Sequence, residues 1–106
     1  MKLTELTSHD DLRRARRIQD PAYAAEADRL ALAEAVSIAV VHYRTEHGLS
    51  QTVFAERLGW KQPHIARLER GDVVPSIESL QRLARAGVIE VHVKRDGTSV
   101  REMAAA

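Results

Sequence analysis

A chain of 106 residues has room for one domain with a modest hydrophobic core, and little room for a solvent-filled catalytic cleft. Hydrophobic residues make up 44% and charged residues 29% of the chain, a balance that excludes a disordered protein. Aromatic residues make up only 4%, so the core must be aliphatic, which suits packed helices better than a β-sandwich. Because the net charge is only +1, any binding to nucleic acid must come from local placement of arginine and lysine.

The composition also excludes several kinds of site. No cysteine is present, which excludes disulfides and thiolate zinc sites. The segment from Met1 to Asp11 lacks the features of a signal peptide, and the nearly uncharged residues 30–43 are too few to cross a bilayer, which takes about 20. His42 and His47 lie on different faces of one expected helix without acidic companions. We therefore expect a cytoplasmic protein that is not an enzyme, with no metal, no cofactor and no membrane contact.

The first segment, residues 1–20, is polar and contains a run of arginines, Arg13, Arg14, Arg16 and Arg17. Candidate helix caps precede the run at Ser8 and Asp10. The segment is expected to form either a short helix or an arm that becomes ordered only on a partner. Asp20-Pro21 then predicts a helix start, with aspartate as the N-cap and proline in the first helical position.

A long alanine-rich helix is predicted from Pro21 to about His47, with Gly48 ending it. Its apolar residues recur at helical spacing, at Leu32, Val36, Val40 and Tyr43. Ile38 and Val41 point away from that face. Because a helix that is apolar on two sides is buried on two sides, we expect a second copy or a partner protein to cover Ile38 and Val41.

Three short helices and a β segment are predicted to follow. Two helices, at about residues 51–58 and 62–70, flank Gly59-Trp60-Lys61, and the first is capped by Ser50. The third runs from a Ser76 cap to Gly87. Residues 88–93 have strand chemistry, and residues 94–97 resemble a turn with Gly97 in the left-handed conformation. A hairpin is possible here, but a lone two-stranded ribbon is marginal in water, so this strand is expected to pair with something, most simply its symmetry mate.

The two helices around Gly59 meet the demands of a helix-turn-helix, in which the second helix lies in the DNA major groove. Phe54 and Leu58 give the first helix an inward face, and Ala55 permits close approach. Ile65 and Leu68 hold the second helix. Hydrogen-bonding and basic side chains are left for its outward face, namely Lys61, Gln62, His64, Arg67 and Arg70.

A series of motifs extends this pattern, namely Gly48-Leu49-Ser50-Gln51, Phe54-Ala55-Glu56-Arg57-Leu58-Gly59, Gln62, His64-Ile65, Arg67-Leu68-Glu69-Arg70-Gly71, Pro75-Ser76 and Leu80. Over about residues 33–88 the chain resembles the Xre/Cro-C1 family of phage repressor-like domains. The resemblance implies an all-α, lambda repressor-like fold of about five helices, here with a short C-terminal strand or hairpin. It divides the chain into an N-terminal arm or short helix (1–20), a repressor-like domain (21–87) and a C-terminal strand or hairpin with a tail (88–106).

The resemblance also implies roles for individual residues. Gln51 would bond a DNA phosphate at a helix N-terminus, and Gln62 and Arg67 would read adenine and guanine. Lys61, His64 and Arg70 would contact phosphates or base edges, and Glu69 would be structural, bonding locally. Two departures from the family stand out: Lys61 replaces the usual Ser or Thr cap, and Pro63 replaces a polar reader and gives up one base contact.

These features favour a transcriptional regulator that binds double-stranded operator DNA as a homodimer. The Asp-Pro step before an alanine-rich helix resembles HigA-like antitoxins, which implies a repressor of its own operator and a toxin partner contacted by the N-terminal segment. The alternative is a protein-interaction module that uses the same fold without binding DNA. The outward Arg67 and Arg70 favour the DNA-binding interpretation.

Overall fold

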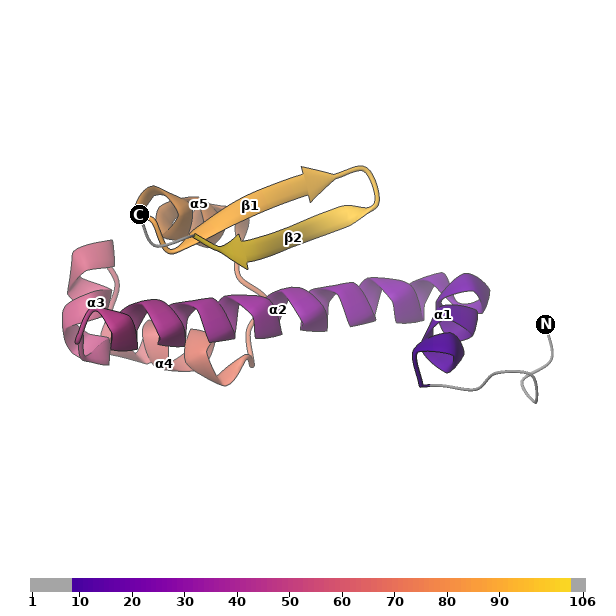
Figure 1. Cartoon of the computed structure of the whole chain (residues 1–106), viewed down its shortest axis with the longest axis horizontal. Helices are drawn as coiled ribbons and strands as arrows, with labels where there is room; N and C mark the ends of the chain where they lie inside the picture. Colours follow the sequence, from indigo (N-terminus) through magenta and orange to yellow (C-terminus); the bar gives the residue numbers. More distant parts are fainter. Residues whose placement is uncertain (1–8, 104–106) are drawn as a thin grey trace.

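The computed structural model describes residues 9–103, which form five helices followed by a β-hairpin (Figure 1). In chain order the elements are α1 (His9–Gln19), α2 (Pro21–Glu46), α3 (Gln51–Leu58), α4 (Gln62–Arg70), α5 (Ile77–Arg85), β1 (Ile89–Lys94) and β2 (Gly97–Glu102). The candidate cap at Ser8, the rest of the first eight residues and the last three residues of the tail lie outside the described residues. Within the described part, no helix is long and apolar enough to span a membrane.

The long helix α2 begins where the sequence predicted. The Asp20 side chain accepts hydrogen bonds from the backbone N–H groups of Ala22 and Tyr23, at 3.1 and 3.2 Å, and Pro21 occupies the first helical position. These bonds satisfy amides that have no partner inside the helix. The helix ends at Glu46, with His47 as its C-cap.

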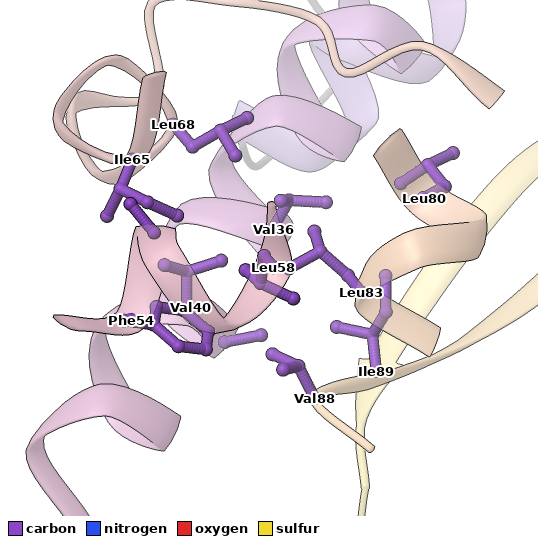
Figure 2. Close-up of a cluster of buried hydrophobic side chains, with 12 residues drawn as sticks. Val36, Val40, Phe54, Leu58, Ile65, Leu68, Leu80, Leu83, Val88 and Ile89 are labelled. Carbon is purple, nitrogen blue, oxygen red and sulfur yellow. The ribbon is translucent and has the colours of Figure 1, made fainter. Parts of the chain in front are cut away.

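The hydrophobic core lies between α2, α3, α4, α5 and the start of β1 (Figure 2). Its largest fully buried side chains are Phe54, Ile65, Leu68, Leu80, Leu83, Ile89, Val36 and Val40. Aliphatic residues dominate this set, as the scarcity of aromatic residues predicted. The buried part of α2 begins only at Ala33, so nearly half of this helix precedes its first buried residue.

The C-terminal segment forms a hairpin within one chain. β1 and β2 pair antiparallel, with Val91 opposite Val100 and Lys94 opposite Gly97. Val91 and Val100 pack against the core, and this burial fixes which face of the ribbon points inward. Gly97 has the positive φ predicted for it, although at 157° this angle is far from the left-handed helical value of about +57°. Arg95 and Asp96 form the turn. Neither has a positive φ, so the turn is not one of the hairpin types that need a positive φ at a central residue.

α1 and the start of α2 extend away from the core. α1 lies at the end of α2 farthest from α3 and α4 (Figure 1) and buries no side chain. It is held to α2 by an ion pair between Arg17 and Asp28 and by Arg16, which lies 4.3 Å from the centre of the Tyr23 ring. Ile18 on this arm is 84% exposed. Residues 9–19 are thus helical, but they contribute nothing to the core.

Candidate nucleic-acid interface

α3 and α4 form a helix-turn-helix around a left-handed glycine. Gly59 has φ of 74° and caps α3, a conformation that costs glycine no steric penalty. The N–H of Trp60 donates to the Ala55 carbonyl at 2.8 Å, which closes the turn. The Ser50 hydroxyl caps α3 by accepting from the N–H of Val53 at 3.1 Å. The sequence predicted Gly59 as the turn residue and Ser50 as the cap, and the structure adds the hydrogen bond from Trp60.

Side chains buried between the two helices fix their angle. Phe54, Ala55 and Leu58 of α3 are buried, as are Ile65 and Leu68 of α4. Ala55 is fully buried, so a larger side chain here would push the helices apart. The orientation of α4 relative to the rest of the domain is therefore set by packing.

A chain of polar contacts joins α2, α4 and α3 behind the outward face of α4. Arg44 donates from Nε and Nη2 to the two Glu69 carboxylate oxygens at 2.7 and 2.8 Å. The Gln51 amide donates to Glu69 at 3.2 Å and accepts from the Gln62 amide at 2.8 Å. Arg44 also donates to the Leu49 carbonyl at 3.1 Å. The two bonds from Arg44 to Glu69 have the two-point geometry of a strong arginine–carboxylate pair.

Glu69 is the centre of this chain. Its side chain is 9% exposed and that of Arg44 is 20% exposed. The hydrogen bond to Glu69 raises the pKa of Arg44, an effect that outweighs the opposing effect of burial. The resemblance predicted a structural role for Glu69, with local bonding. Its partners are in fact distant in sequence, because α4 packs across α2 and α3.

The outward face of α4 exposes Lys61, Pro63, Arg67 and Arg70, with Ala66 partly exposed between them. Among the described residues, neither Lys61 nor Arg67 forms an ion pair, so both cations are available to a ligand. Arg70 differs, because its Nε donates to Asp72 at 2.8 Å. The pair is exposed on both sides and is weakly held.

His64 lies at the edge of this face and not on its outward side. It is partly buried, its ring meets that of Trp60 edge-on at 4.5 Å, and its Nε2 is buried without a hydrogen-bond partner among the described residues. Burial lowers the pKa of His64, and the charges of Arg67 and Arg82 lower it further. The ring is therefore neutral at neutral pH and packs against the turn.

Arg82 of α5 braces the turn from behind, a contact that the sequence did not predict. Its Nη1 donates to the Leu58 carbonyl at 3.0 Å, and its guanidinium lies 5.7 Å from the centre of the Trp60 ring. The only signal in the sequence is a basic residue on the polar side of a predicted helix, which is too common to identify a partner.

Residues 42–87 match the family model described as Helix-turn-helix. No curated protein and no solved structure matches the chain. All the residues predicted to contact DNA lie inside the matched range. With the five helices and the C-terminal hairpin, this match confirms a mostly helical, lambda repressor-like fold. The match covers less than half of the chain, and this similarity to a helix-turn-helix family suggests a DNA-binding regulator.

Proposed function

We propose that this protein is a sequence-specific transcriptional regulator that binds operator DNA as a homodimer, with α4 in the major groove. One observation carries the proposal: α4 presents Arg67, which has no ion-pair partner within residues 9–103, and a Gln62 amide that Gln51 holds in place. A protein-interaction module would not need this pairing of an oriented amide with a free guanidinium.

The contact between Gln62 and Gln51 leaves Gln62 suited to adenine. One Nε2 hydrogen of Gln62 is used by Gln51, so its other Nε2 hydrogen and its Oε1 are free. Adenine offers N7 as an acceptor and N6–H as a donor in the major groove, which is the complement of that free pair. Holding the amide before DNA arrives also reduces the entropy lost on binding.

The remaining contacts divide between bases and phosphates. Arg67 has the fork geometry that matches guanine O6 and N7. Lys61 and Arg70 would contact DNA phosphates, and Arg70 would give up its exposed ion pair with Asp72 to do so. Gln51 keeps one amide hydrogen at the start of α3, where backbone N–H groups also favour a phosphate. His64 would contribute only at the edge of the contact.

A homodimer follows from the small size of one reading helix. A single α4 contacts few base pairs, and two copies related by a two-fold axis read two half-sites. Ile38 on α2 is 45% exposed, and Val41, on the same side of the helix, is partly exposed. These residues form the second apolar side predicted from the sequence, and they are where we place a protein contact.

We further propose that the protein is an antitoxin that represses its own operon. The support is the arm formed by α1 and the start of α2, which buries nothing and exposes Leu12, Ile18 and Leu30. Such a surface, distant from α4, lets one chain hold a toxin and DNA together. A small basic open reading frame immediately beside this gene would support the antitoxin role, and a solitary gene would contradict it.

Replacing Arg67 by alanine tests the reading role. The Arg67→Ala change is expected to cost roughly 1–3 kcal/mol on the cognate operator and to relax the preference at one base pair, because a two-point contact with guanine is lost. Binding would be measured by titration on cognate and on random DNA. The control is Arg95→Ala, which removes the same charge from the exposed hairpin turn. An equal loss on both DNAs would make Arg67 a phosphate contact and contradict base reading.

A further inference from the structure

The N-terminal part of the outward α4 face is apolar at its centre. An α-helix turns about 100° per residue, so Pro63 and Arg70, seven positions apart, lie within about 20° of one line. That line is opposite the buried pair Ile65 and Leu68. Pro63 is exposed, and Ala66, one turn further on, is partly exposed. Two apolar side chains thus lie where α4 would approach the bases most closely.

The surroundings leave Pro63 to face the DNA directly. On the helix Pro63 lies between Gln62, held to Gln51, and Arg67, which forms no ion pair in the part of the chain that the structure describes. His64, the next residue, packs its ring edge-on against Trp60, and Pro63 stays exposed. The missing N–H of proline is not needed, because the first-turn amides of a helix have no partner inside it.

The chemistry of the pyrrolidine ring selects one kind of base edge. The ring has no donor or acceptor, so a polar base edge pressed against it loses water and gains nothing. The C5 methyl of thymine is the one apolar group in the major groove and gains from the contact. The ring has no rotamers to freeze, so the contact costs no side-chain entropy.

We propose that Pro63, with Ala66 beside it, recognises thymine methyl groups between the base pairs read by Gln62 and Arg67. The inference rests on the proposed sequence-specific binding of DNA and adds to it. The sequence alone indicated that Pro63 gives up a contact. With Pro63 at the centre of the exposed face, the polar contact is replaced by an apolar one, and specificity is retained.

Deoxyuridine tests this directly, because it differs from thymidine only in the methyl group. The full chain would first select its operator from randomised duplex DNA, and each thymidine of that operator would then be replaced by deoxyuridine in turn. At the position facing Pro63 we expect the wild-type Kd to rise roughly fourfold, the loss that corresponds to about one buried methyl group. The Pro63→Ser variant, which keeps an allowed residue in the first turn, should bind both DNAs equally at that position.

Two further arms complete the experiment. The Val93→Ser variant removes a 73% exposed apolar side chain on the hairpin and should keep the wild-type response. Wild type should bind an operator with 5-methylcytosine paired to guanine at the same position more tightly than one with unmethylated cytosine paired to guanine. If wild type binds every deoxyuridine operator as tightly as the original, or if Pro63→Ser keeps the thymidine preference, the methyl contact is refuted while the proposed function stands. If the protein selects no sequence from the randomised DNA, the methyl contact and the proposed sequence-specific function are both contradicted.

Discussion

Replacing Glu69 by alanine is expected to lower the free energy of unfolding by about 3 kcal/mol and to weaken binding to the operator. The carboxylate is 9% exposed and accepts two hydrogen bonds from Arg44 and one from Gln51. Without it, the largely buried guanidinium of Arg44 keeps the Leu49 carbonyl as its one hydrogen-bond partner among the described residues. Gln51 also loses the acceptor that orients it, so Gln62 is no longer held for base recognition.

Urea unfolding and operator titration on the same variants separate the two effects. The double replacement Arg44→Met with Glu69→Leu removes both charges and is expected to recover most of the lost stability, because apolar pairs can replace a buried ion pair at little cost. It should not recover affinity, since nothing then orients Gln51. A Glu69→Ala protein as stable as wild type would contradict the structural role of Glu69. Full affinity in the double variant would contradict the orienting role of Gln51.

Phe54→Ala is expected to be the most damaging single truncation in the core, at about 4 kcal/mol. The ring is 1% exposed, is the only phenylalanine in the chain, and stacks on Tyr43 at 5.5 Å between ring centres. Its loss leaves a cavity under the first helix of the helix-turn-helix. A domain of this size typically has only 5–15 kcal/mol of stability, so a large part of it would be lost.

The neighbouring residue provides a matched control for Phe54. Val53 lies on the same helix but is 41% exposed, and Val53→Ala should change the free energy of unfolding by less than about 0.5 kcal/mol. Chemical denaturation of both variants measures the difference. Comparable losses from the two changes would show that the core is not centred on Phe54.

The helices and their ends were predictable because their signals are local. Asp20, Ser50 and Ser76 accept hydrogen bonds from backbone N–H groups two or three residues away, and Gly59 adopts a conformation that other residues disfavour. The inward positions followed from helical spacing. Caps, turns and spacing together place α4 and give its outward face before any tertiary contact is known.

The partners within the site were not predictable, because they join residues far apart in the chain. Arg44 and Glu69 are 25 positions apart, and Arg82 and the Leu58 carbonyl are 24 apart. Many arginines and acids in the sequence could have formed such pairs, and packing of the helices decides which do. The contact of His64 with Trp60 and the ion pair of Arg70 with Asp72 are local, yet they also emerged only from the structure, because spacing does not fix which rotamer a side chain adopts.

Contact of the α4 face with DNA is tested most directly by the salt dependence of operator affinity. Lysine and arginine bound to phosphates release counterions, so the logarithm of the binding constant should fall linearly and steeply with the logarithm of the salt concentration. In the Lys61→Ala variant the slope should be smaller in magnitude by about 1. An affinity that stays flat while the salt concentration rises several-fold would contradict DNA binding by this face.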